Sequence, residues 1–417
     1  MNKTILATAV ASLLTPALFT TLHAKTTNYS SASQNSGNWK GSVIIEGNYI
    51  DRSNTDELEI SGMPSGGHAH GLDEGLQFGH SELVVTGNIS DSISARFTAA
   101  IIQAAEEEED GIEAELEEAF IETQALGNGL GLKAGRFFSD VGYLSSKHNH
   151  EADFADQPLI YEGMFGEHAI GDGLQLNYLA NTDMFLQFGS ELFFDEEFPS
   201  GKTKGAISSV ALNAKVGGDI GTNHSWLAGI GHWRADNITD RSGGAHEHEG
   251  EAATETPRFS GDSQINTINA LYKWAPNGNA KERNLKLQAE YFHRKEKGRI
   301  DMVEADGSFE ETTSYNGTQS GWYAQAIYQF RPQWRVGIRH DHLNISNTGS
   351  DEEILEEAEL LSSGHTPKRN SIMLDYSPRE YSRLRLQFNR DERSENKDDQ
   401  IILQYIHSFG AHGAHSF

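Results

Sequence analysis

Apolar and polar residues alternate along most of the chain in windows of about ten residues, which are separated by residues that favour turns. Alternation with a period of two is typical of a strand that buries one of its faces. The pattern predicts about 16 strands, at 42–50, 75–89, 92–103, 115–126, 130–138, 173–180, 184–193, 206–216, 224–235, 264–274, 284–294, 320–330, 333–343, 370–376, 383–390 and 400–409.

The two faces are clearest in the strands 333–343 and 383–390. In both segments the even positions are mostly apolar and the odd positions are mostly charged or polar. One apolar and one charged face over about ten residues suits a strand between lipid and water. A soluble antiparallel barrel or sandwich would also alternate, but it could not bury so many inward charges without partners.

The connections between the predicted strands alternate in length. Tight turns, such as Ser90-Asp91 and Arg331-Pro332, alternate with long polar segments. Short turns at one end and long loops at the other are typical of outer-membrane barrels, which have an even number of strands. We therefore predict an all-β fold, a transmembrane antiparallel β-barrel of about 16 strands with long external loops.

Composition and the first residues fit an outer-membrane location. Residues 1–24 have the basic start, apolar run and small-residue cleavage site of a signal peptide, 25–40 form a short polar lead, and 41–417 form the barrel. There is no cysteine for disulfides. After the leader no run of about 18 apolar residues predicts a membrane helix. A formal net charge of −28 excludes nucleic acid as a partner and favours cations.

The segment 139–170 interrupts the strand pattern for about 30 residues, which is long for a connection and is typical of a functional loop. It contains histidines, acids and aromatic residues in close succession. We expect this loop to fold into the barrel and to set the width and charge of the lumen.

Histidine pairs with one residue between them occur four times in the chain. In extended backbone, residues i and i+2 project to the same side, so both imidazoles can bind one metal ion. Imidazole with carboxylate suits zinc, copper or nickel. The alternative is that these residues are solvated loop positions. The candidate metal ligands are His148, His150, His168, Glu151, Asp153, His68, His70, His246 and His248. The pair His340 and His342 has the parity of the lipid-facing residues, which argues against a role in the lumen.

Charged residues on the predicted inward faces are separated along the chain. The candidate pore-lining residues are the acids Glu82, Glu118 and Glu122 and the bases Lys286, Arg335, Arg339, Arg383 and Arg385. A basic wall opposite an acidic loop would produce a transverse field across a constriction. The alternative is that wall charges pair with one another and stiffen the barrel.

Three segments carry a resemblance to a known family: EEAFIET at 117–123, LKAGRFFSDVGYLSSKHNHEADFADQPL at 132–159, and the ending SFGAHGAHSF. They resemble an outer-membrane porin-like β-barrel family that is distantly related to the phosphate-selective porins. Some relatives are described as zinc-regulated or TonB-dependent outer-membrane receptors. The resemblance implies a channel with a link to metal supply. Phosphate specificity is not expected, because the segment 131–168 is rich in acids.

These observations predict a porin-like diffusion channel in the bacterial outer membrane. The more specific prediction is that this channel takes up zinc or small metal-linked solutes. The alternative is a surface barrel with a closed lumen that binds a metal or a partner protein. No sequence motif of a hydrolase or a nucleotide-binding enzyme is present, so we expect no enzymatic activity. We expect that no cofactor is required. Zinc or another divalent cation is the ligand that the candidate histidines and acids could bind. The expected partners are lipopolysaccharide, the barrel assembly machinery and other copies of the chain, as a homotrimer or a monomer.

Overall fold

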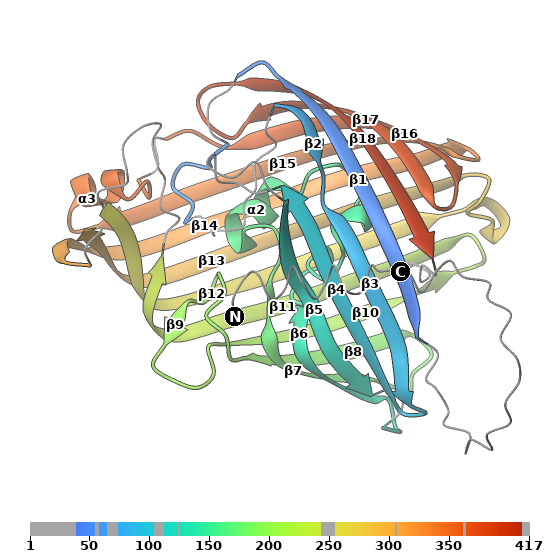
Figure 1. Ribbon diagram of the computed structural model, residues 1–417, viewed down its shortest axis with the longest axis horizontal. Helices are drawn as coiled ribbons and strands as arrows, with labels where there is room; N and C mark the ends of the chain where they lie inside the picture. The colour runs from blue at the N-terminus through green and yellow to red at the C-terminus, as the bar shows by residue number, and fades with distance from the viewer. Residues whose placement is uncertain are drawn as a thin grey trace, which may run out of the picture.

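The computed structural model describes residues 39–54, 58–64, 74–103, 112–123, 126–242, 255–304, 307–361 and 364–410. Within these residues, 18 antiparallel strands form one sheet that closes on itself when β1 pairs with β18 (Figure 1). Sixteen strands make up the wall, while the short β2 continues the line of β3 along β1 and the short β9 pairs with the far part of β11. The prediction of a barrel of about 16 strands is confirmed.

The strands follow one another around the barrel in chain order. Their bounds are β1 (Lys40–Arg52), β2 (Gly75–Phe78), β3 (Ser81–Ser90), β4 (Ile93–Gln103), β5 (Ile112–Thr123), β6 (Leu130–Phe138), β7 (Ile170–Leu179), β8 (Phe185–Phe193), β9 (Lys202–Thr203), β10 (Ser209–Ile220), β11 (His224–Ser242), β12 (Glu255–Trp274), β13 (Asn284–Glu304), β14 (Phe309–Arg331), β15 (Trp334–Gly349), β16 (Lys368–Arg379), β17 (Ser382–Glu392) and β18 (Asp398–Gly410). The helices are η1 (Asn149–Glu151), α2 (Leu159–Phe165), η2 (Pro276–Gly278) and α3 (Glu352–Glu357).

The strands β11 to β14 are 19 to 23 residues long, about twice the length that the sequence pattern predicted. Part of what we expected to be external loops is therefore barrel wall, and β13 and β14 are joined by residues 305–308 only. The reason is that outward positions such as Lys295, Lys297 and Arg299 are polar beyond the apolar band, while backbone pairing continues. Strand pairing needs only backbone groups, so apolar alternation marks the lipid-facing stretch and not the whole strand.

Large apolar side chains cover the outer face of the wall. Ile230 on β11, Ile268 on β12 and Ile338 on β15 are each more than half exposed. An exposed apolar surface of this extent requires lipid, because water would not solvate it favourably. Among the described residues, none of the helices has the length and hydrophobicity that a membrane-spanning helix requires.

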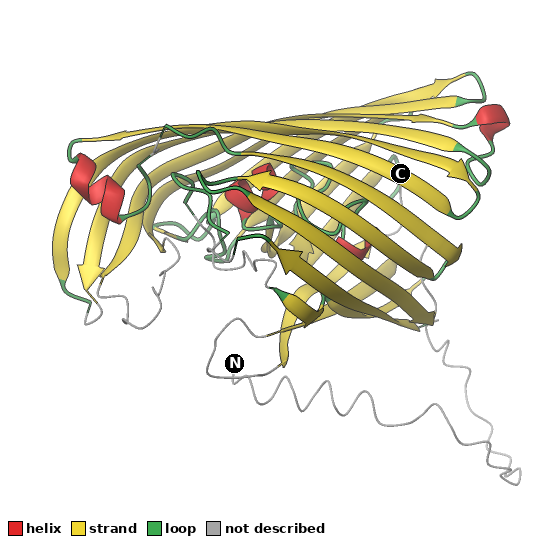
Figure 2. Cartoon of the chain, turned by 90° about the horizontal axis from the view of Figure 1, so that it is seen from above, coloured by secondary structure: helices red, strands yellow, loops and turns green. Residues whose placement is uncertain are grey.

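The segment 139–169 leaves the wall after β6 and returns to it at β7, and it lies inside the ring of strands (Figure 2). Its helix α2 follows Pro158 and ends at Gly166, whose positive φ of 68° a glycine adopts without steric cost. Six of the seven residues of α2 are buried, and the helix packs against β14 and β15. The segment is therefore an inner layer of the protein and not a surface loop.

Apolar residues gather on one side of the barrel interior, where the loop packs against the wall. Inward residues of β11 to β14, including Trp233, Ile265 and Phe292, form one core with Leu159 and Tyr161 of α2. The inward faces carry these apolar residues where they meet the helix, and polar inward residues such as Glu290 lie among them. Alternation at these strands is consequently weaker than in β15 or β17.

We predict that the end of the barrel that carries the long strands faces the outside of the cell. Because the chain has no cysteine, single Lys→Cys variants can be labelled without background. Lys297→Cys lies on the extended part of β13 and should react with a membrane-impermeant maleimide on intact cells. Lys281→Cys, in the turn before β13 at the other end, is the matched control and should react only after lysis. Labelling of the Lys281 variant alone would invert the orientation.

Candidate functional site

The loop 139–169 is fixed to the arginine-rich part of the wall by buried ion pairs. Asp153 lies 2.8 Å from Lys286 Nζ and 3.0 Å from Arg335 Nη1. Asp156 lies 2.9 Å from Arg339 Nη2 and 3.1 Å from an Nη atom of Arg369. These bases come from β13, β15 and β16, so the acidic part of the loop is held against three strands.

The remaining pore-lining arginines hold the loop through its backbone. Arg383 donates to the carbonyl oxygens of His150 and Ala152 at 3.3 and 3.0 Å, and Arg385 donates to Ala152 at 2.9 Å. Arg385 also pairs with Asp375 on β16 at 2.9 Å. The basic wall and the acidic loop are thus in direct contact, so their charges are compensated locally. A transverse field across an open gap does not follow from this arrangement.

The ion pairs change the acidity of the loop carboxylates. Burial alone would raise the pKa of Asp153 and of Asp156, but the neighbouring lysine and arginine charges outweigh burial and hold both pKa values well below the usual range. A carboxylate whose folded pKa is depressed contributes stability above its unfolded pKa of about 3.9, and this contribution is lost as the pH falls further. The attachment of the loop therefore persists at pH 5.

The first residues of the loop are held by a second set of buried carboxylates. Glu290 on β13 accepts hydrogen bonds from the backbone N–H of Tyr143 and Leu144 and from the hydroxyl of Tyr161. Glu191 on β8 accepts from the Asp140 backbone at 2.9 Å. The loop stem is consequently attached to β8 and β13.

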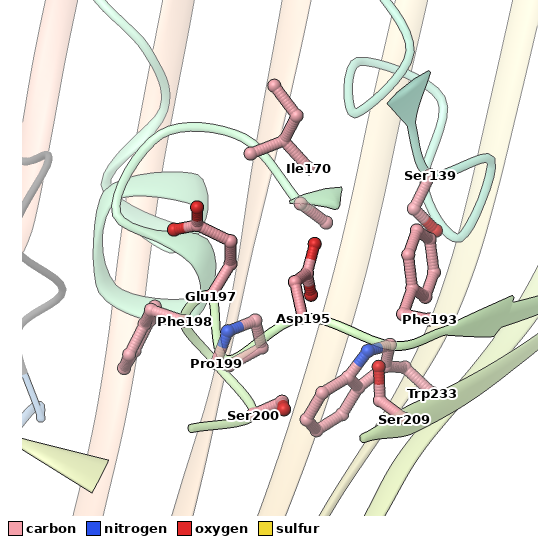
Figure 3. A pocket seen from close by; sticks show the side chains of 11 residues that line it. Ser139, Ile170, Phe193, Asp195, Glu197, Phe198, Pro199, Ser200, Ser209 and Trp233 are labelled. Atoms are coloured by element: carbon pink, nitrogen blue, oxygen red, sulfur yellow. The ribbon is translucent and has the colours of Figure 1, made fainter. Parts of the chain in front are cut away.

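Where the stem meets the segment after β8, a crevice of about 10 Å³ is lined by Ser139, Phe193, Asp195, Trp233 and neighbouring residues (Figure 3). This volume holds about one water molecule. The crevice is therefore a packing gap and is too small to be a site for a solute.

The histidine part of the loop meets an acidic part of the wall. His148 Nε2 lies 2.9 Å from Glu118 Oε2, while His148 Nδ1 lies 3.3 Å from Glu82 Oε2 and 3.4 Å from Glu117 Oε2. All four side chains are at most 5% exposed. Burial would lower the pKa of His148, but the surrounding glutamates outweigh it and raise the pKa well above its usual value.

Glu117 and Glu118 are consecutive residues, yet both side chains are buried at this site. The register between β4 and β5 shifts here, because Thr98 pairs with Glu118 while Ala99 pairs with Leu116. Such a β-bulge places an extra residue on one strand and redirects side chains. The sequence pattern placed only Glu118 inward, because strict alternation would point Glu117 toward lipid. An acidic residue at a lipid-facing position was the signal that could have revealed the bulge.

The other histidines near the loop have different surroundings. His150 Nδ1 lies 2.8 Å from Glu82 Oε1, and His80 Nε2, from the break between β2 and β3, lies 2.8 Å from Glu117 Oε1. His168 Nε2 lies 2.9 Å from the amide oxygen of Asn149. Burial lowers the pKa of His168 to about 4, so its imidazole is neutral. His80 was absent from the sequence-based candidates because it has no histidine partner two residues away.

The structure brings together part of the predicted metal-binding set. His148 and His150 share Glu82 as a neighbour, but Asp153 lies with Lys286 and Arg335, and Glu151 faces Lys147 at 3.9 Å. A carboxylate that already compensates two cations is a poor metal ligand.

The candidates His68, His70, His246 and His248 lie outside the described residues. Glu122 is inward on β5 and accepts from the Ser94 hydroxyl. His340 and His342 pack with tilted rings against the outward Trp322, in line with their parity.

Comparison with known structures shows the same architecture. OmpT of Vibrio cholerae without its loop L8 aligns with a TM-score of 0.52 and 10% identity, over 89% of this chain and 99% of OmpT. An anion-selective porin from Comamonas acidovorans gives 0.52 and 11% identity, over 89% and 100% of the two chains. Salmonella typhi OmpF in complex with daunomycin gives 0.51 and 13%, over 89% and 97%. The chain has the fold of the outer-membrane porins.

Similarity in sequence extends to one bacterial protein. An Aquifex aeolicus protein described as uncharacterized is 28% identical over 410 residues, which cover 90% of this chain and 79% of the relative. No protein-family model matches the chain. These comparisons establish the porin-like barrel and leave the solute to the chemistry of the lumen.

We predict that Asp156→Asn destabilises the folded barrel, because Arg339 and Arg369 lose a buried carboxylate. Removing one partner of a buried ion pair costs about 3–5 kcal/mol, and the other acids around these arginines should bring the loss to the lower end. Unfolding by urea in detergent measures the change.

The matched control is Asp399→Asn, which removes the carboxylate of an exposed pair with Arg390. Its effect should be small, because water screens exposed pairs. Equal destabilisation by both substitutions would show that Asp156 has no special role in holding the loop.

Proposed function

We propose that the protein is a porin-like diffusion channel of the bacterial outer membrane, in which the loop 139–169 determines what can pass. The observation that carries this proposal is the loop itself, which crosses the lumen and is held by charges on both sides of the wall. A constriction set by a loop rather than by the wall can differ between proteins of one fold. It also allows a wide barrel to select small solutes.

Water-accessible charges inside the barrel support a passage beside the loop. Lys286, Arg335 and Arg96 point inward and keep 21, 22 and 37% of their side-chain surface exposed. These residues lie in the half of the wall that ends in short turns. A solute from that end would meet charged side chains up to the level of the loop. From the other end, Glu162 keeps 16% exposure next to Arg393.

The finer proposal is that divalent cations, zinc foremost, are among the solutes. Three buried carboxylates and one histidine meet at one side of the loop. The chain also carries a net charge of −28, which attracts cations to the mouth of the barrel. The resemblance to zinc-regulated outer-membrane receptors points in the same direction. Dependence on TonB and selectivity for phosphate are not part of this proposal.

A second candidate function is a barrel with a closed lumen that binds a metal or a partner at the cell surface. The observation that favours it is the apolar core formed by α2 and the inward faces of β11 to β14. Met63, in the segment after β1, joins the same core and lies against Gly163 of α2. A loop packed in this way would have to move before a large solute could pass.

Partners in the membrane follow from the fold. We propose contact with lipopolysaccharide around the outward face and insertion by the barrel assembly machinery. A structure of Vibrio cholerae OmpT is described as a trimer. For the present chain we propose a homotrimer, with a monomer as the alternative. On the outer wall, a hollow whose lining includes Ala228, Ala270, Ala289, Ala324 and Ala326 offers a surface for another copy.

We predict that releasing the loop raises conductance in a planar lipid bilayer. The double variant Asp153→Asn with Asp156→Asn removes both loop carboxylates from the basic wall, and deletion of 143–162 removes the crossing segment. Both should give larger single-channel currents and admit larger solutes than the wild type. Asp399→Asn, far from the loop contacts, should conduct as the wild type does.

The opposite result has a clear meaning. If neither the wild type nor either loop variant conducts while all of them fold, the lumen is closed and the binding-barrel alternative stands. If the wild type conducts and loop removal changes nothing, the passage does not run beside the loop.

A further inference from the structure

Where the loop meets the glutamate wall, three buried ligand atoms have no hydrogen-bond partner, and one of them, an imidazole nitrogen, lies close to the other two. They are His148 Nδ1, Glu82 Oε2 and Glu117 Oε2. The imidazole nitrogen lies 3.3 Å from the first oxygen and 3.4 Å from the second. A buried polar atom without a partner costs about 1–3 kcal/mol, so three at one place require an explanation.

The distances match a metal site. Zinc binds nitrogen and carboxylate oxygen at about 2.0–2.2 Å, which places neighbouring ligands of a tetrahedral site about 3.3–3.6 Å apart. Ligand atoms of Glu82 and Glu117, together with one of His80, also lie within 4.8 Å of one another. Two carboxylates and a neutral imidazole compensate a divalent charge and suit a transition metal better than calcium, which prefers oxygen alone.

The surrounding residues orient these ligands as a metal site requires. His148 Nε2 lies 2.9 Å from Glu118 Oε2, and a proton shared there leaves Nδ1 as the free lone pair. Glu118 is itself held by the Thr98 hydroxyl at 3.1 Å. The other oxygen of Glu82 contacts His150, and the other oxygen of Glu117 contacts His80. Each proposed ligand therefore has its second polar atom fixed by a neighbour, and binding of the ion at Nδ1 releases the second imidazolium proton of His148 to solvent.

We infer that one transition-metal ion, zinc by the best fit, binds between His148 of the loop and Glu82 and Glu117 of the wall. The fourth position is left to water or a passing solute, and His80 positions Glu117. This inference deepens the proposed function by naming a metal site in its lumen. Such an ion would tie the histidine part of the loop to β3 and β5, opposite the arginine contacts.

The test uses the purified full chain in detergent after removal of bound metal by a chelator. Zinc binding is measured by equilibrium dialysis, and cobalt is used as a spectroscopic probe of the same site. The wild type should bind one ion more tightly than the variants do, with the strong visible absorption of four-coordinate cobalt. His148→Ala and Glu117→Gln should weaken zinc binding by about 100-fold or more and abolish the cobalt bands. His80→Ala should weaken it by about 10-fold, as for the loss of an orienting neighbour.

Two controls separate this site from other ligands in the chain. Glu46→Gln changes a buried inward carboxylate on β1 that accepts hydrogen bonds from the amide side chains of Asn48 and Gln404, and it should bind zinc as the wild type does. A background in which His68, His70, His246 and His248 are alanine removes the predicted loop pairs and should keep the tight ion. Glu82→Gln is a further ligand variant, should His148→Ala fail to fold.

The inference is overturned if folded His148→Ala and Glu117→Gln bind zinc as tightly as the wild type, or if the wild type binds no ion beyond what those variants bind. In the second case protonated histidines compensate the glutamates. Bilayer conductance is recorded on the same samples. If the protein conducts but binds no ion tightly, the channel function stands and the metal site is wrong. If it binds an ion tightly but does not conduct, the metal site stands and the channel function is wrong.

Discussion

Charge matching across the lumen is the constraint on which the arrangement of this barrel depends. Two parts of the loop 139–169 each meet wall charges of the complementary kind: a histidine half with His148 and His150, and a carboxylate half with Asp153 and Asp156. Buried charges are costly unless they are paired, so neither half can move without leaving its wall partners exposed to that cost. The loop is therefore positioned by two sets of contacts on different strands, and its place determines what remains of the lumen.

A single irregularity in the wall makes the histidine half chemically special. The bulge turns both Glu117 and Glu118 inward. Together with Glu82 they make three carboxylates around the imidazole of His148. Arg96, at 3.3 Å from Glu118, is a nearby wall cation. Carboxylates so close together repel one another unless a proton or a metal ion lies between them. The carboxylates of the wall therefore require a compensating positive charge. The loop histidines alone supply that charge only when they are protonated.

The apolar half of the interior has a different consequence. The helix α2 rests on inward faces of β11 to β14, so this side of the barrel is packed like the core of a soluble domain. Any passage must run along the charged side or await movement of the loop. In a channel of the kind proposed above, the same packing would narrow the passage and restrict the size of the solutes. The rigidity of the lumen and the width of such a passage would both follow from how firmly the loop is held.

The sequence alone determined the strand number, the closure of the sheet and the inward parity of residues such as Glu82, Arg339 and Arg385. It could do so because a strand between lipid and the barrel interior must alternate, and alternation is a local property of the chain. Only the tertiary structure decided which charges meet. Asp153 is close in sequence to His148 and His150 but lies with Lys286, Glu117 enters the lumen through a register shift between strands, and His80 reaches it from a strand break. Partner choice and register depend on contacts between residues far apart in the chain, and such contacts leave no periodic trace in the sequence.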